Sequence, residues 1–189
     1  MRYKPAPWLT LRRALPRGSV GADDVFVDFG SGMGRVVFQA AMRYPFNRVT
    51  GVELSARLHE VARTNIDRNR HRLHARRVEL VHGDVMDYEV PDDVTVAFFD
   101  NPFVGRIFAT VVDRLIASVD QAPRRLRIIY FNPVEHERLM GHRPRPPGQA
   151  DQWAAPRSGV GVVERHARVR RGGRGVVSSR LTTARYRAR

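Results

Sequence analysis

Short runs of valine, isoleucine and phenylalanine recur along the first two thirds of the chain. They cover residues 25–29, 48–53, 78–81, 94–99 and 126–131. These runs are nearly continuous rather than alternating, which is typical of strands that are covered on both faces. The pattern therefore predicts five buried strands.

Between these runs, apolar residues recur at helical spacing and mark amphipathic helices. The helical patterns cover residues 36–41, 58–66 and 107–119. Strands and helices that alternate in this way form right-handed βαβ units around a parallel sheet. We therefore expect an α/β fold with a doubly wound, mostly parallel sheet and helices on both faces.

The pattern changes after Met140. Prolines and glycines in residues 141–159 oppose regular structure and predict an exposed loop. Residues 160–169 and 176–187 are expected to form an antiparallel hairpin at the sheet edge, which brings the sheet to seven strands. With 189 residues, the chain fits one domain at 25–189, preceded by an N-terminal extension at 1–24.

A glycine-rich segment, DFGSGMG at residues 28–34, follows the first predicted strand directly. Ligands of open α/β sheets bind at this edge, and glycine lets the backbone turn tightly and approach a cofactor. The amides at the start of the next helix suit either a phosphate or a carboxylate, so both kinds of cofactor remain open at this point. The spacing G-x-G-x-G, with Asp28 two residues ahead of the first glycine, departs from the dinucleotide pattern G-x-G-x-x-G.

Acidic residues end the second and third predicted strands. Glu53 lies about twenty residues beyond the loop, where a carboxylate can accept hydrogen bonds from both hydroxyls of a ribose. Asp84 follows the third strand and could accept from an adenine amino group while Val85 packs near the ring. Each of them alone is more often an ordinary polar residue at a strand end, but together with the loop they favour an adenosine ligand.

These segments resemble the successive motifs of class I, seven-strand S-adenosylmethionine-dependent methyltransferases, over residues 25–133. The resemblance implies S-adenosylmethionine as cofactor and a methyltransferase activity. It places the first motif around the methionine moiety, Glu53 on the ribose and Asp84 on the adenine. The full set of expected cofactor-binding residues is Asp28, Gly30, Ser31, Gly32, Gly34, Glu53, Leu54, Asp84 and Val85.

Within this class, VDFGSGMGRVVFQAA and GVELSARLHEVARTNI are similar to the cofactor half of seven-strand protein lysine methyltransferases. They are closer still to small uncharacterised bacterial methyltransferases. The lysine enzymes have a larger N-terminal region that shapes the substrate channel, whereas about 24 residues precede the first strand here. A lysine substrate is therefore not carried over.

The fourth strand runs into Asp100, Asn101, Pro102 and Phe103, which resemble the D/N-P-P-F/Y motif of amino-group methyltransferases. In that motif a polar side chain and a carbonyl hold the acceptor nitrogen, and the aromatic ring stacks on the target. Either Asp100 takes the first place with Asn101 replacing a proline, or Asn101 begins a shortened motif. Methyl transfer requires alignment of the nucleophile and, for an amine, loss of its proton. The alternative is a strand-ending turn with Phe103 packed in the core.

Histidines follow the second and third predicted strands without the partners of a metal site. His59, His71 and His74 are interpreted as parts of a solvated helix face. His82 and His136 could border the pocket, but a lone histidine is more often structural. No metal site is predicted.

The net charge of +14 would attract polyanions, so nucleic acid is a possible partner. Lys4 is the only lysine, however, and such an arginine bias can come from a GC-rich genome. The absence of cysteine excludes disulfides and thiolate sites, and no signal peptide or membrane span is predicted, so we expect a cytoplasmic protein.

The sequence thus predicts an S-adenosylmethionine-dependent methyltransferase that acts on a nitrogen of a small molecule or protein. The alternatives are an RNA or DNA base methyltransferase and a noncatalytic cofactor-binding protein of the same fold. The oligomeric state stays open.

Overall fold

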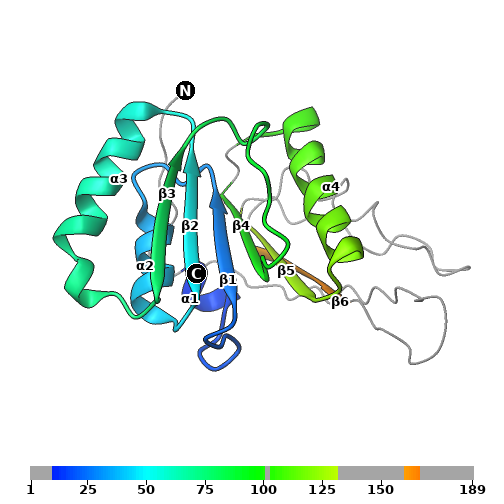
Figure 1. The fold of residues 1–189 in the computed structure, drawn as a ribbon, viewed down its shortest axis with the longest axis horizontal. Helices are drawn as coiled ribbons and strands as arrows, with labels where there is room; N and C mark the ends of the chain where they lie inside the picture. The colour runs from blue at the N-terminus through cyan, green and yellow to red at the C-terminus, as the bar shows by residue number, and fades with distance from the viewer. Residues whose placement is uncertain (1–9, 101–102, 132–159, 167–189) are drawn as a thin grey trace, which may run out of the picture.

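The computed structural model describes residues 10–100, 103–131 and 160–166, which form one sheet with helices on its two faces (Figure 1). The strands are β1 (Val25–Phe29), β2 (Arg48–Glu53), β3 (Arg77–His82), β4 (Val96–Asp100), β5 (Arg125–Phe131) and β6 (Val160–His166). The helices are α1 (Thr10–Ala14), α2 (Arg35–Arg43), α3 (Ala56–Arg68) and α4 (Gly105–Gln121), with a 3-10 turn η1 (Arg70–Arg72).

The strand order is β3-β2-β1-β4-β5-β6 within the described part of the chain. Strands β1 to β5 are mutually parallel, and β6 runs antiparallel to β5. The predicted α/β fold with a parallel sheet is confirmed. The first strand of the expected hairpin is present as β6, while residues 176–187 and the proline-rich segment 141–159 lie outside the described residues. A seventh strand therefore stays a prediction.

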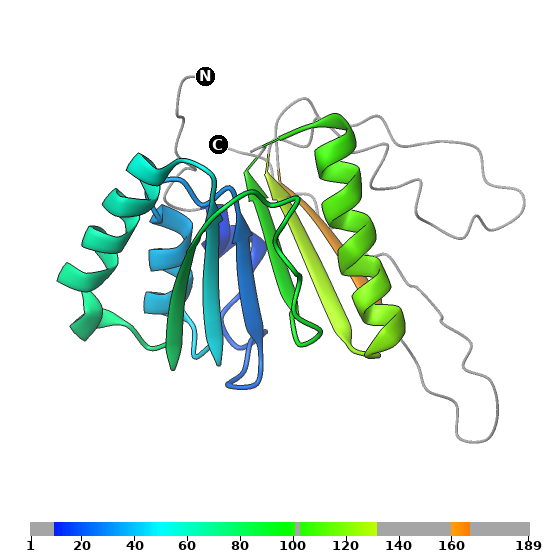
Figure 2. The same ribbon diagram turned by 45° about the horizontal axis from the view of Figure 1, so that its top comes forward.

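Two apolar clusters cover the two faces of the sheet. On one face, side chains of α1 and α2 pack against Phe26, Phe98 and Ile129 of the strands. On the other face, α4 packs against alternate residues of the same strands, such as Val27 and Phe99. Figure 2 shows α4 lying along β5, away from α2 and α3. Because both faces are covered, the strands read as continuous apolar runs in the sequence.

The helix α1 was not predicted and belongs to the core. Leu11 and Leu15 are fully buried in the cluster that contains α2, and the Tyr44 hydroxyl donates a hydrogen bond to the Leu15 carbonyl. The helix has five residues, too few to show a helical period in the sequence. Part of the expected N-terminal extension thus packs on the sheet.

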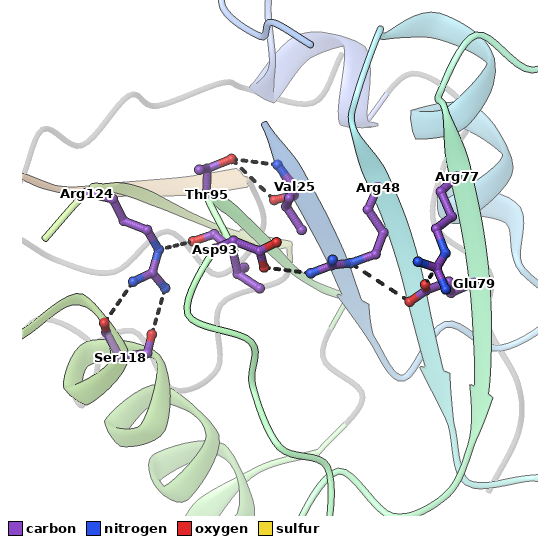
Figure 3. A network of polar contacts seen from close by, with 9 residues as sticks. Val25, Arg48, Arg77, Glu79, Asp93, Thr95, Ser118 and Arg124 are labelled. Carbon is purple, nitrogen blue, oxygen red and sulfur yellow. Dashed lines mark hydrogen bonds and ion pairs between the residues drawn. The ribbon is translucent and has the colours of Figure 1, made fainter. Parts of the chain in front are cut away.

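Arginine side chains fix the amino-terminal edge of the sheet (Figure 3). Arg124 precedes β5 and donates to the Val94 carbonyl at 2.7 Å and to both oxygens of Ser118 in α4 at 2.7 and 2.8 Å. Arg48 of β2 pairs with Asp93 at 2.6 Å. These contacts tie the starts of β2, β4 and β5 together, and the opposite edge holds the candidate site.

Candidate cofactor and acceptor site

The candidate site lies where the strand order reverses, between β1 and β4. Phe29 pairs with Val52 of β2 and with Phe99 of β4. The residues that follow these three strands are therefore neighbours at the carboxyl edge of the sheet. Open α/β sheets bind their ligands at such a switch point.

The glycine loop turns sharply from β1 into α2. Gly30, Gly32 and Gly34 have φ angles of +79°, +55° and +75°, in the left-handed region that favours glycine. The amides of Gly30 and Ser31 both donate to the Val52 carbonyl at 2.9 Å. A β-carbon on Gly34 would lie 2.9 Å from the β-carbon of Ala62 in α3. The loop is thus held against β2 and α3 with no room for a side chain at Gly34.

The side chain of Ser31 lies on β2 beneath the loop. Its hydroxyl is buried, with no hydrogen-bond partner among the residues that the structure describes. A β-carbon on Gly51 would come within 2.9 Å of this hydroxyl oxygen and 2.7 Å of Val37 Cγ2. Gly51 is thus needed for the loop to approach β2, and sequence reasoning missed it. A lone glycine inside a strand pattern is the signal that could have revealed it.

Glu53 connects the glycine loop to the turn before α3. Its Oε2 accepts a hydrogen bond from the Gly32 amide at 2.7 Å, and its Oε1 accepts from the Ser55 amide at 2.8 Å. Ser55 in turn caps α3 by accepting from the Leu58 amide. A carboxylate has about four acceptor positions, so two donors leave capacity for further ones. The carboxylate is therefore fixed in place and still able to bind a diol.

Asp84 begins the turn after β3. Its Oδ1 accepts from the Met86 amide at 2.8 Å, and its carbonyl accepts from the Asp87 and Tyr88 amides. Val85 is buried in the apolar cluster beneath α4. The turn leaves acceptor capacity on the Asp84 carboxylate, as an adenine contact requires.

Asp28 is the most deeply buried carboxyl group at this edge, with 3% of its surface exposed. Burial raises its pKa well above the usual range, and the nearby charges of Asp100 and Glu53 raise it further. Glu53 receives two amide donors, whereas the charged groups that act on Asp28 are carboxylates. The environment therefore favours the protonated form of Asp28.

The acceptor side is formed by the end of β4. Asp100 is half-buried and pairs with Phe131 of β5 in the sheet. The Phe103 ring stands edge-on to Phe99, with ring centres 6.0 Å apart. Asn101 and Pro102 lie outside the described residues. The structure thus brings Asp100 and Phe103 to the edge that also carries Asp28 and Glu53.

Three large apolar side chains are exposed after β2 and around the start of α4. Val104 at the start of α4 is 51% exposed and Ile107 in its first turn is 38% exposed. Leu54, after Glu53, is 66% exposed.

No helix in the described ranges is long and apolar enough to cross a membrane. The same ranges contain no group of three or more histidine, aspartate and glutamate side chains that could hold a metal ion.

The sheet order, the glycine loop after β1 and the acidic residues after β2 and β3 define the Rossmann-like methyltransferase class. A family model described as histone methylation protein DOT1 matches residues 10–132. The match covers more than half of the chain, from α1 to the end of β5, and the chain therefore belongs to the DOT1 family. Family membership confirms the predicted class of S-adenosylmethionine-dependent methyltransferase.

Among curated proteins, the chain is similar to a protein-lysine N-methyltransferase of Saccharolobus islandicus, with 29% identity over 97 residues. The alignment covers 51% of this chain and 58% of that relative, so the chain matches little more than half of the relative's length.

Among solved structures, the chain is similar to an RNA methyltransferase from Salinibacter ruber in complex with S-adenosylhomocysteine. The identity is 25% and the TM-score 0.53, over 68% of this chain and 78% of that one. A precorrin 8w decarboxylase of Methanobacterium thermoautotrophicum reaches the same TM-score at 21% identity, over 72% of this chain and 70% of that one. At that identity the likeness concerns the fold alone.

Proposed function

We propose that this protein transfers the methyl group of S-adenosylmethionine to a nitrogen of a protein or small molecule. The observation that carries the proposal is the convergence of the glycine loop, Glu53 and Asp100 at one edge of the sheet. Membership of the DOT1 family supports the reaction class. The lysine methyltransferase among the relatives supports a nitrogen acceptor.

The cofactor side is proposed to work through shape and fixed acceptors. The glycine loop, from Asp28 to Gly34 and including Ser31, encloses the methionine moiety with its backbone. Glu53 binds the ribose hydroxyls with its remaining lone pairs, since Gly32 and Ser55 already hold the carboxylate in place.

The base is proposed to lie between the turns after β2 and β3. Asp84 accepts a hydrogen bond from the adenine amino group, and Leu54 and Val85 offer apolar contact to the ring. The high exposure of Leu54 fits a side chain that a ligand covers.

The acceptor side is proposed to align a nitrogen nucleophile. The cofactor supplies an electrophilic methyl group on a sulfonium, so the protein must orient the acceptor and receive its hydrogen bonds. Asp100 or Asn101 accepts from the acceptor nitrogen, which directs its lone pair toward the methyl group, and Pro102 belongs to the same motif. Phe103 borders the target, with Val104 and Ile107 as an apolar rim.

The proposal is tested with tritiated S-adenosylmethionine and fractionated cell extract, followed by digestion of the labelled fraction. Label in protein or in a small molecule is expected. Asp100→Ala and Asn101→Ala are each expected to reduce transfer while cofactor binding persists, and Asp23→Ala, an exposed carboxylate before β1, serves as control.

Three results would contradict parts of the proposal. Binding of S-adenosylmethionine with no transfer to any fraction would favour the noncatalytic alternative. Unchanged transfer by both the Asp100 and Asn101 variants would remove the acceptor assignment. Unchanged cofactor affinity in Gly32→Arg would show that the cofactor site is misplaced.

Nucleic acid is the second candidate acceptor. It is favoured by the net charge of +14 and by the likeness to an RNA methyltransferase. This alternative requires label in RNA or DNA and binding that weakens steeply with added salt. Label confined to protein or small molecules would exclude it.

A further inference from the structure

The backbone of Glu53 is fixed on its strand side by the sheet. Glu53 pairs with His82 in the register of β2 and β3, and the Gly83 amide donates to the Glu53 carbonyl at 3.0 Å. The peptide group that joins Leu54 to Ser55 lies outside the sheet, in the turn into α3. This turn also supplies the Ser55 amide that holds Oε1 of the Glu53 carboxylate.

His82 reaches across from β3 to this turn. Its Nε2 lies 3.2 Å from the Leu54 carbonyl oxygen. A carbonyl oxygen only accepts hydrogen bonds, so a neutral ring must carry its proton on Nε2 to make this contact. The ring also lies beside His59 of α3, with ring centres 5.6 Å apart. His82 therefore connects β3, the turn after β2 and the first part of α3.

Two contacts hold the peptide group between Leu54 and Ser55: its carbonyl meets His82, and its amide donates to Glu53 Oε1. The Leu54 side chain is 66% exposed and adds little packing. If the turn rotated, the Ser55 amide would move away from Oε1, and the Glu53 carboxylate would lose one of its two fixed donors. A carboxylate that binds a ribose must hold both oxygens in place before the ligand arrives, since ordering on binding weakens affinity.

We propose that His82 is a positioning residue for cofactor binding, which holds the Leu54 carbonyl and thereby presents the Glu53 carboxylate to the ribose. This inference rests on the proposed function, because it takes Glu53 as the ribose ligand. His82 acts through the Leu54 carbonyl and Glu53.

The test compares two substitutions by calorimetric titration with S-adenosylhomocysteine. In His82→Gln the amide nitrogen occupies the place of Nε2 along the side chain, so the hydrogen bond to Leu54 persists. In His82→Asn the side chain is too short for it. A hydrogen bond contributes about 0.5–1.5 kcal/mol net, which predicts about two- to tenfold weaker binding by His82→Asn and nearly unchanged binding by His82→Gln.

A double-mutant cycle with Glu53→Gln tests whether His82 acts through Glu53. In the Glu53→Gln background, His82→Asn is expected to weaken binding less than in the wild type, because the two residues serve one contact. His71→Asn, an exposed histidine in η1, is the matched control and is expected to bind as the wild type does.

The outcomes separate the inference from the proposed function. Absence of wild-type binding to both S-adenosylmethionine and S-adenosylhomocysteine would overturn the proposed function and the inference with it. If the wild type binds normally, the proposed function stands. The inference alone is then overturned if His82→Asn lowers the melting temperature but leaves the affinity for S-adenosylhomocysteine unchanged. The inference is also overturned if His82→Gln and His82→Asn weaken binding equally. Additive effects of His82→Asn and Glu53→Gln on the binding free energy would overturn it as well.

Discussion

Replacement of Gly34 by alanine tests how tightly the glycine loop is held against α3. Gly34 has a φ of +75°, a conformation that costs an L-residue about 1–2 kcal/mol. The new β-carbon would lie 2.9 Å from the β-carbon of Ala62, well inside the ordinary contact distance of about 3.5–4.0 Å between carbons. Such overpacking costs about 1–3 kcal/mol. Gly34→Ala is therefore expected to lower the free energy of unfolding by about 2–5 kcal/mol.

Urea denaturation measures this loss of stability. Substitutions at two other glycines separate the backbone strain from the overlap with Ala62. Gly18 has a φ of +83°, and a β-carbon added there would meet no atom within 4 Å, so Gly18→Ala carries the backbone strain without the overlap. Gly21 has neither the positive φ nor a close neighbour, so Gly21→Ala is expected to be nearly neutral.

The overlap with Ala62 can also be relieved directly. Ala62→Gly removes the opposing β-carbon at a cost of about 1 kcal/mol in a helix, and the double variant Gly34→Ala/Ala62→Gly is expected to be less destabilised than the sum of the two. The reasoning is refuted if Gly34→Ala destabilises no more than Gly18→Ala does, or if the double variant shows strict additivity.

Three further substitutions test the core and the site. Because the folded state binds the Asp28 proton more tightly than the unfolded chain, stability falls as pH rises from the unfolded pKa of the carboxyl group toward its raised folded pKa. Asp28→Asn removes this loss and is expected to raise the melting temperature more at pH 8 than at pH 4, so an equal change at both would contradict the raised pKa. Arg124→Met removes the donor to the Val94 carbonyl and to the Ser118 hydroxyl, while the Ser118 carbonyl keeps the Ala122 amide. The loss is expected to cost about 1–3 kcal/mol in urea denaturation, whereas Arg63→Ala, which removes an exposed ion pair, should change little. Gly51→Ala is expected to weaken S-adenosylhomocysteine binding in calorimetry by displacing Ser31, and unchanged affinity would show that the loop adapts.

The parallel sheet could be predicted because its strands are covered on both faces. β1 and β2 begin and end at the predicted residues, since every residue of β1 is buried and β2 is buried throughout its middle. At β4 the apolar run is longer than the strand. Val94 is buried in the core but precedes β4, and its amide donates to the Pro91 carbonyl in the preceding turn. Apolar character alone cannot separate such a residue from a strand residue.

The meeting of the glycine loop and Glu53 could also be predicted, because the ends of neighbouring parallel strands lie at one edge. The direction of the Ser31 side chain could not be predicted, since it depends on how closely the glycine loop approaches Gly51 of β2. The contact of His82 with Leu54 depends on the pairing of β3 with β2, which leaves no periodic trace in the sequence. The roles of Asp28, Glu53, Asp84 and Asp100 toward ligands stay predictions.

The stacked rings of Phe29 and Phe99 link the two halves of the candidate site. Their centres are 5.0 Å apart and their planes differ by 10°, and Phe29 leads into the glycine loop while Phe99 precedes Asp100 and contacts Phe103. A displacement of one ring must move the other, because a packed interior has no free volume to absorb it. Under the proposed function, a substitution at Phe29 is therefore expected to change the Michaelis constant for the acceptor as well as the affinity for the cofactor.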